Sequence, residues 1–383
     1  MYITSDVRYI GVNDRKKDLF EGQYIVPEGI AYNSYLIVDE AVAVMDTVDR
    51  DFGDEWLKNI KDEIGDRTID YLVVHHMEPD HSANIKRFRR EYPNAKIVAT
   101  AKAFGMMQAF FGEDHLPYGV VVKEGDKLSL GKHTLTFITA PMVHWPEVMV
   151  SYDERDKILF SADAFGKFGA LDCDEEWACE ARRYYVGIVG KYGAQVRALL
   201  AKAEKLDVAI ICPLHGPVLK ENLAYYLNLY DIWSSYRPEE SGVAIAYTSV
   251  YGNTERAVMM LKEQLEARGT KVAVSDLARC DMAEAVEDAF RYDRLVLATT
   301  TYNGDVFPFM REFINHLTER NYQNRKLGFI ENGSWAPMAK KVMLKMLEGS
   351  KDLFFIDKSV KINSALNKDS EAEIIALADE LCK

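Results

Sequence analysis

The segment Tyr71–His81, with the sequence YLVVHHMEPDH, is the most informative stretch of the chain. Its first residues are apolar and predict a buried strand. Three of the residues that follow are His76, Glu78 and Asp80, and a second imidazole stands next to them at His81. Residues i and i+2 of an extended segment share a side, so we expect the first three to point into one pocket. Such crowding is costly unless a cation compensates it, which favours a metal site over a surface loop that happens to be rich in acid and histidine.

Three further candidate ligands follow other predicted strands. His144 comes after the run 135–140 (LTFITA), Asp163 ends the run 157–163 (KILFSAD), and His215 follows the run 208–214 (VAIICPL). Each alone has an ordinary structural interpretation, as a buried histidine or a helix-capping aspartate. Together with the first segment they complete two sets of three ligands and one shared carboxylate, which is the donor set of a dinuclear centre.

The first part of the chain alternates β-rich runs with a few helices. The runs 35–48 and 96–100 have strand character, whereas 51–64 and 82–92 have helical periodicity. Strands outnumber helices and several are joined by short turns, which predicts two packed sheets with helices outside, an αββα sandwich of the α+β class.

The second part changes to strict β–α alternation. The segment 237–242 (RPEESG) combines proline, charge and glycine, as linkers do, so we predict a first domain at 1–240 and a second at 241–383. Five β–α units follow, the last with a strand at 353–362. This order predicts an α/β domain with an open, doubly wound parallel sheet.

Three loops at strand ends of the second domain suggest a ligand site. The segment 248–254 (TSVYGNT) supplies hydroxyls and a helix N-terminus, which together can hold a phosphate, although the same turn could be a simple N-cap. Tyr302 and Trp335, from two later loops, offer flat faces to a tricyclic ring. The expected cofactor-binding residues are Thr248, Ser249, Tyr251, Gly252, Asn253, Thr254, Thr300, Thr301, Tyr302, Asn303, Gly304, Asp305, Gly333, Ser334, Trp335 and Ala336.

These motifs resemble the flavodiiron proteins, also called A-type flavoproteins, the family of rubredoxin:oxygen oxidoreductases and nitric oxide reductases. The family has a metallo-β-lactamase-like domain followed by a domain similar to short-chain flavodoxins, and the resemblance covers nearly the whole chain. Hydrolases of the β-lactamase superfamily carry HxHxDH, whereas this chain has HxExDH with Glu78 at the second position. An added anionic oxygen ligand favours iron over zinc.

The resemblance implies two iron ions in an oxo- or hydroxo-bridged centre, together with FMN. One iron would be held by His76, Glu78 and His144, and the other by Asp80, His81 and His215. Asp163 would be the bridging carboxylate.

The resemblance also implies an oxidoreductase that detoxifies O₂ by reducing it to water, or NO by reducing it to N₂O. Its electron donor would be rubredoxin, with F420 or a flavin reductase system as alternatives, and it would form a homodimer or a dimer of dimers. Two other functions stay open: a zinc-dependent metallo-β-lactamase-type hydrolase with a flavodoxin module, and an electron carrier with a vestigial metal domain. Glu78 argues against the former, and the complete ligand set argues against the latter.

The composition excludes several classes of protein. The 383 residues carry 60 acidic and 47 basic side chains, a net charge of −13, which disfavours nucleic acid as a partner. No apolar run is long enough for a membrane span. Five cysteines without CxxC spacing disfavour a disulfide framework, and the charged N-terminus differs from a signal peptide, so we expect a cytoplasmic protein. The sequence shows no rubredoxin-like CxxC pair after the flavodoxin module, as expected of the two-domain class with a separate donor.

Overall fold

The structure is a computed structural model that describes residues 1–383. Its internal contacts divide the chain into two compact units. The first comprises Met1–Tyr185 and Ala194–Asp231, and the second Val186–Gly193 and Ile232–Lys383. This division assigns residues 186–193 and 232–240 to the second unit, whereas the sequence predicts a first domain at 1–240.

The first unit contains two large sheets stacked on each other. The first sheet has the order β1 (Val7–Tyr9), β6 (Tyr35–Val38), β7 (Val42–Met45), β8 (Tyr71–Val73), β9 (Lys96–Ala99) and β10 (Gly119–Val121). The second has the order β11 (Lys127–Ser129), β12 (Thr134–Thr139), β13 (Met149–Asp153), β14 (Ile158–Phe160) and β15 (Ile210–Cys212). Two small antiparallel pairs accompany them, β2 (Val12–Asp14) with β5 (Ile30–Tyr32) and β3 (Leu19–Phe20) with β4 (Tyr24–Ile25).

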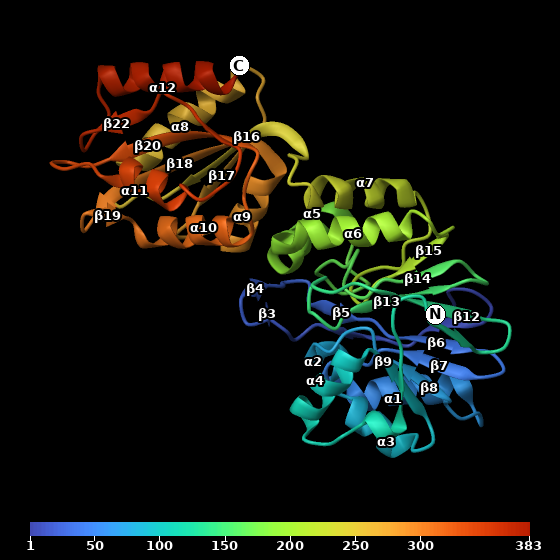
Figure 1. Cartoon of the computed structure of the whole chain (residues 1–383). Helices are drawn as coiled ribbons and strands as arrows, with labels where there is room; N and C mark the ends of the chain where they lie inside the picture. Colours follow the sequence, from blue (N-terminus) through green and yellow to red (C-terminus); the bar gives the residue numbers. More distant parts are fainter. The chain divides into compact units, whose positions relative to one another are not determined.

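Helices cover both outer faces of this pair of sheets (Figure 1). The first sheet is covered by α1 (Gly53–Ile64), α2 (Pro79–Ser82), α3 (Ile85–Glu91) and α4 (Ala101–Phe111). The second is covered by α5 (Trp177–Tyr184), α6 (Gly193–Ala203) and α7 (Leu223–Ser234). Side chains from both inner faces, such as Met45, Val73, Phe137 and Phe160, are fully buried in one core between the sheets. The predicted αββα sandwich is therefore confirmed.

The segment after β8 differs from its prediction in one respect. His76 and Glu78 lie in the loop, but Asp80 and His81 belong to the short helix α2. Pro79 is the first residue of that helix, where its fixed φ angle and missing N–H are tolerated. The expectation that Asp80 continues an extended segment with Glu78 is therefore wrong.

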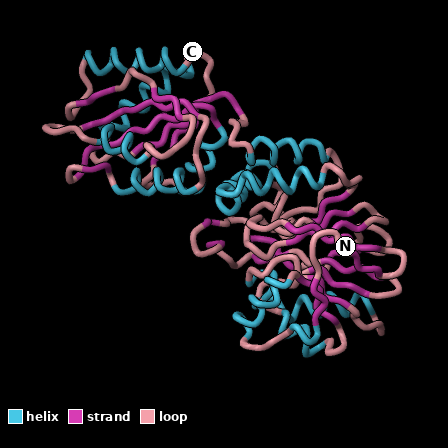
Figure 2. The backbone as a smooth tube through the Cα atoms, in the orientation of Figure 1, coloured by secondary structure: helices cyan, strands magenta, loops and turns pink.

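The second unit is built on one parallel sheet with helices on both faces (Figure 2). Its order is β17 (Val272–Asp276), β16 (Glu240–Tyr247), β18 (Tyr292–Tyr302), β20 (Arg325–Asn332) and β21 (Leu353–Phe355), with β19 (Asp305–Val306) and β22 (Val360–Ile362) attached. The helices are α8 (Asn253–Glu266), α9 (Met282–Arg291), α10 (Pro308–Glu319), α11 (Ala339–Met346) and α12 (Lys368–Leu381). This is the strand order of flavodoxin-like folds, as predicted.

The strand expected at 353–362 is in fact two short strands. Both β21 and β22 pair in parallel with β20, one with its first half and the other with its second half. The four residues between them are not part of a strand, although the backbone N–H of Ile356 still donates to the oxygen of Leu327. An edge position permits this interruption because only one side is paired. None of the helices in the structure is both long and apolar enough to cross a membrane.

Candidate functional site

Seven potential metal ligands of the first unit meet at one end of its sheets. His76 and Glu78 follow β8, Asp80 and His81 lie on α2, and His144 lies in the connection between β12 and β13. Asp163 follows β14, and His215 follows β15. Site residues collect where strands end, because there the backbone turns away from the sheet and frees side chains to converge. The structure thus brings together all seven residues that the sequence singles out.

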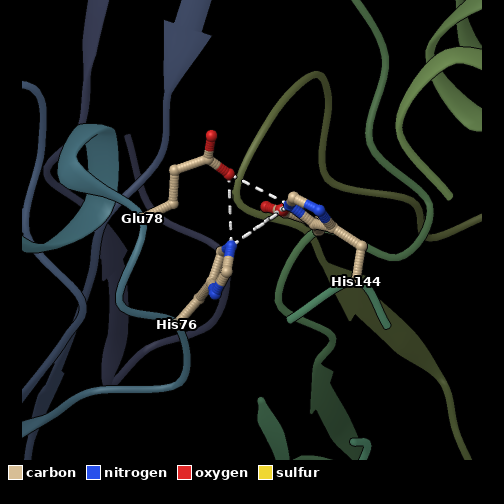
Figure 3. A group of neighbouring side chains, drawn as sticks. His76, Glu78 and His144 are labelled. Atoms are coloured by element: carbon tan, nitrogen blue, oxygen red, sulfur yellow. Dashed lines mark hydrogen bonds and ion pairs between the residues drawn. The ribbon is translucent and has the colours of Figure 1, made fainter. Parts of the chain in front are cut away.

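The first group consists of His76, Glu78 and His144 (Figure 3). Oε2 of Glu78 lies 3.2 Å from Nε2 of His76 and 3.0 Å from Nε2 of His144. The two Nε2 atoms are 3.3 Å apart, and Figure 3 shows both rings and the carboxylate turned toward one another. Distances of this size between donor atoms are expected when each donor lies about 2.1 Å from one cation.

The second group consists of Asp80, His81 and His215. The Nε2 atoms of the two histidines are 3.0 Å apart, and Oδ2 of Asp80 lies 3.3 Å from each of them. This group therefore has the same composition as the first, with two imidazoles and one carboxylate.

Asp163 divides its carboxylate between the two groups. Its Oδ2 lies 3.4 Å from Nε2 of His76 and 3.2 Å from Nε2 of His144. Its Oδ1 lies 3.3 Å from Nε2 of His81 and 3.9 Å from Nε2 of His215. One carboxylate with one oxygen facing each group is the arrangement of a bridging ligand in a dinuclear centre.

The polar atoms of this cluster fit a pair of cations. Both carboxylate oxygens of Asp80 and of Asp163 are buried without a hydrogen-bond partner. Buried carboxylate oxygens without partners are costly, and a cation between them removes that cost. The imidazole nitrogens that face each other in pairs cannot both be donors to each other, so lone pairs remain to bind a metal.

The charges of the cluster shift the pKa values of its members. Burial lowers the pKa of His144, but the carboxylates of Asp163 and Glu78 outweigh it and raise this pKa to about 9. Burial likewise opposes ionisation of Asp163, yet His76 and its neighbours hold the pKa of that carboxyl well below its usual range. The carboxylates therefore favour positive charge within the cluster, whether protons on the imidazoles carry it or a cation that displaces those protons.

Aromatic rings lie against histidines of both groups. The ring of Trp145 lies edge-on to His76 at 5.2 Å, and Phe20 lies edge-on to His215 at 5.4 Å. Phe20 belongs to the β3–β4 hairpin, whose tip carries Glu21. Partial burial and the carboxylate of Glu78 raise the pKa of Glu21 to about 7. Nothing in the local sequence of the hairpin indicates this proximity.

A buried hydrogen-bonded chain supports the first group from behind. Nδ1 of His75 lies 2.5 Å from Oδ2 of Asp46, and its Nε2 lies 2.7 Å from Oγ of Ser151. Oδ1 of Asp46 accepts the backbone N–H groups of His75, at 2.7 Å, and of His76, at 3.4 Å. The chain links β13 of one sheet to the end of β8 in the other, and so fixes the backbone that presents His76.

Replacing Asp46 by alanine is expected to destabilise the first unit by about 3–5 kcal/mol, because a buried imidazole and two N–H groups lose their acceptor. Urea unfolding of metal-free protein measures this. Asp62→Ala, which removes an exposed ion pair with Lys58, should change the unfolding free energy by less than about 0.5 kcal/mol. Equal effects of the two substitutions would contradict the structural role of the chain.

A third group of potential ligands lies at the other end of the β12–β13 pair. Nδ1 of His133 is 3.0 Å from Oδ2 of Asp153, and Asp156 is close by. Here Arg155 lies 3.7 Å from Asp156, and Thr4 donates a hydrogen bond to the same carboxylate. The carboxylate of Asp156 already has a cation and a donor, and we assign no metal to this group.

The second unit contains a pocket of about 630 Å³ at the loops that follow β16, β18 and β20. Ser249 of the loop before α8 lines this pocket together with Asn253 and Thr254 of the first helical turn, and a helix N-terminus suits an anion. Thr254 is buried at the pocket wall, and its hydroxyl accepts a hydrogen bond from Asn332 at 3.4 Å. The hydroxyl hydrogen of Thr254 therefore stays available to a ligand.

Two aromatic side chains at this pocket are almost fully exposed. Tyr251 is 92% and Trp335 is 90% exposed, although both line the pocket. Tyr302 lines it as well, and its ring lies edge-on to Phe307 at 5.2 Å. Large exposed aromatic rings around a pocket suit a flat aromatic ligand that would cover them.

Most residues that the sequence assigns to this site line the pocket, but three do not. The hydroxyl of Thr248 is paired with that of Thr299 at 2.6 Å behind the loop. Gly252 forms the N-cap of α8, and its N–H donates to Oγ of Ser249. Asp305 pairs with Arg311. The structure adds four residues to the lining of the pocket, which are Val250, Asn332, Met338 and Ser364. Ser364 lies more than 100 positions after the first loop of the pocket.

Comparison with known families divides the chain in the same way. Residues 30–216 match the family described as ODP family beta lactamase, and residues 244–353 match a flavodoxin domain. The nitric oxide reductase of Moorella thermoacetica is 30% identical over 363 residues, which cover 91% of this chain and 90% of that protein. The anaerobic nitric oxide reductase flavorubredoxin of Escherichia coli is 29% identical over 352 residues, 87% of this chain and 72% of that protein.

Solved structures agree in both units. Rubredoxin oxygen:oxidoreductase from Desulfovibrio gigas has a TM-score of 0.92 at 26% identity, covering 100% of this chain and 97% of that one. The flavodiiron protein from Giardia intestinalis has a TM-score of 0.92 at 25% identity, covering 99% and 97%. The chain therefore combines a β-lactamase-type domain that holds the candidate metal ligands with a flavodoxin-type domain that has a pocket lined by exposed aromatic rings.

Proposed function

The chain belongs to the flavodiiron protein family, and on that premise we propose that it is an oxidoreductase that reduces O₂ to water, NO to N₂O, or both. The single observation that carries this proposal is the carboxylate of Asp163, whose two oxygens face two groups of equal composition. Such a shared ligand supports a dinuclear centre, and the family to which the chain belongs supports redox rather than hydrolytic chemistry at that centre.

We propose iron as the metal at both positions. The first iron would bind His76, Glu78 and His144, the second Asp80, His81 and His215, and Asp163 would bridge them with an oxo or hydroxo ligand. The anionic Glu78 supports iron rather than zinc. Iron and flavin together would supply the electrons that reduction of a diatomic gas requires. The protein's own residues would hold the metal, and the rings of Trp145 and Phe20, which lie against His76 and His215, would limit water near it.

We propose FMN as the flavin. Its phosphate would lie at the start of α8, where Ser249 and Thr254 offer hydroxyls, and its ring system would lie between the loops of Tyr302 and Trp335. The pocket volume falls within the range of about 300–1,000 Å³ that is usual for small-ligand sites, and it supports this assignment.

The partners are part of the same proposal. Rubredoxin is the proposed electron donor, because the names of two similar proteins contain the word rubredoxin. F420 and a flavin reductase system are the alternatives. A homodimer, or a dimer of dimers, is the proposed assembly. None of the five cysteines is joined in a disulfide, which supports a cytoplasmic location, where thiols stay reduced.

The proposal is tested by single-turnover kinetics. Photoreduced protein with known iron and flavin content is mixed anaerobically with O₂ or NO, and flavin absorbance, gas consumption and products are followed. We expect rapid flavin oxidation, with O₂ lost without release of peroxide, or NO lost with formation of N₂O. Bound zinc in place of iron, without either reaction, would favour a hydrolase. Flavin without metal would favour an electron carrier.

A further inference from the structure

The second ring nitrogen differs among the candidate ligand histidines. Nδ1 of His76 lies 2.9 Å from Oε1 of Glu147. Nδ1 of His215 lies 2.7 Å from the backbone oxygen of Ala31, and Nδ1 of His81 is buried without a hydrogen-bond partner. In the described chain, a carboxylate therefore stands behind a ligand of the first group, whereas the second group has a neutral carbonyl behind one histidine and no partner behind the other.

Glu147 is held firmly in this position. It lies in the connection between β12 and β13, close to His144 in sequence, and is 2% exposed. Its Oε1 also accepts the backbone N–H of Met77 at 2.8 Å, so one carboxylate oxygen binds two successive residues of the ligand loop. Its Oε2 is buried without a partner. Burying a carboxylate that has only one of its two oxygens hydrogen-bonded is costly. This cost indicates that the negative charge acts on the imidazole of His76 beside it.

We propose that Glu147 is a positioning residue that makes the metal position of His76, Glu78 and His144 the tighter of the two, so that metal leaves the pair in two steps. This inference rests on the metal centre of the proposed function. The hydrogen bond to Oε1 keeps the proton on Nδ1 of His76 and directs the Nε2 lone pair toward the metal. The negative charge also raises the basicity of the ring, which the carbonyl of Ala31 does less strongly for His215. Each group otherwise has two imidazoles and one carboxylate of its own, and one oxygen of Asp163 faces each, at 3.2–3.4 Å from the histidines of the first group and 3.3–3.9 Å from those of the second.

The chain contains a closely matched control pair at the opposite end of the same two strands. Nδ1 of His133 lies 3.0 Å from Oδ2 of Asp153, both residues are fully buried, and Oδ1 of Asp153 also lacks a partner. Asp153→Asn therefore perturbs a buried carboxylate–histidine pair of the same geometry, but one that touches none of the seven candidate ligands.

The test is the release of iron(II) from the full-length, anaerobically loaded protein to ferrozine. Wild type should release iron in two phases, a fast one from the group of Asp80 and a slow one from the group of His76. Asp80→Asn should abolish the fast phase and leave the slow one. Glu147→Gln, which keeps an acceptor but loses the charge, should accelerate the slow phase about 10-fold, and Glu147→Leu up to about 100-fold. Asp153→Asn should leave both phases unchanged.

Each other outcome overturns a definite claim. A single release phase in wild type, or unchanged slow phases in both Glu147 variants, would overturn the inference while leaving the metal centre intact. An effect of Asp153→Asn as large as that of Glu147→Gln would reduce the role of Glu147 to general stability. Wild-type protein that holds no iron at all would instead contradict the proposed function. If Glu147→Leu fails to fold, Glu147→Gln carries the test alone.

Discussion

Replacing Asp163 by alanine is expected to abolish the reduction of O₂ and NO, lowering turnover by about a thousandfold or more. The carboxylate of Asp163 faces both metal groups, and its loss removes the ligand that they share. Metal catalysis contributes several kcal/mol of transition-state stabilisation, and each 1.36 kcal/mol corresponds to a factor of about ten in rate. Gas consumption by photoreduced protein measures the effect, and iron analysis should show less than the wild-type content.

The same variant should keep its flavin. Asp163 belongs to the first unit and the flavin pocket is formed by the second, so flavin content and reduction by dithionite should equal those of wild type. This control separates loss of the metal centre from general misfolding. Wild-type turnover in Asp163→Ala, with both metals retained, would show that the bridging role is wrong.

A second large effect is expected for flavin binding when Thr254→Val is combined with Trp335→Ala. A hydrogen bond to a charged group contributes about 1.5–3 kcal/mol, and an aromatic contact about 0.5–1.5 kcal/mol. If both side chains bind the cofactor, FMN affinity should fall by about 30- to 2,000-fold, according to the sum of these terms. Fluorescence titration of the flavin-free protein with FMN measures this.

The matched control also removes one hydroxyl and one exposed ring from the second unit. Thr318→Val deletes a hydroxyl that bonds within α10, and Phe354→Ala removes a ring on β21 that is 64% exposed. Neither residue lines the pocket. This double variant should bind FMN like wild type. Equal affinity losses in the two double variants, or none in either, would contradict the assignment of the pocket.

Local sequence patterns were sufficient to predict the fold and to select seven candidate ligands that the structure brings together. The strict β–α alternation after residue 240 predicts a parallel sheet, and each candidate ligand follows a run that the structure shows as a strand or lies on the helix after one. Strand ends converge in any such architecture, so His144 and His215 could be associated with His76 before any distance was known. The resemblance to flavodiiron proteins then supplied the division into two groups.

Contacts between side chains that are far apart in the chain could not be predicted from the sequence. Glu147 contacts His76 across 71 positions of the chain, and its own neighbourhood shows only a charged residue after a proline. The buried chain of Asp46, His75 and Ser151 likewise joins two sheets through side chains with no common motif. Thr248 fits a phosphate loop by pattern, but its hydroxyl is paired with Thr299, a partner on the neighbouring strand.

The most direct test of the central claim is anomalous diffraction from crystals of the purified protein, recorded on both sides of the iron absorption edge. The account predicts two iron peaks, one beside His76, Glu78 and His144 and the other beside Asp80, His81 and His215, with Asp163 in contact with both. Peaks that follow the zinc edge instead, or a single iron peak away from Asp163, would contradict a di-iron centre in this chain.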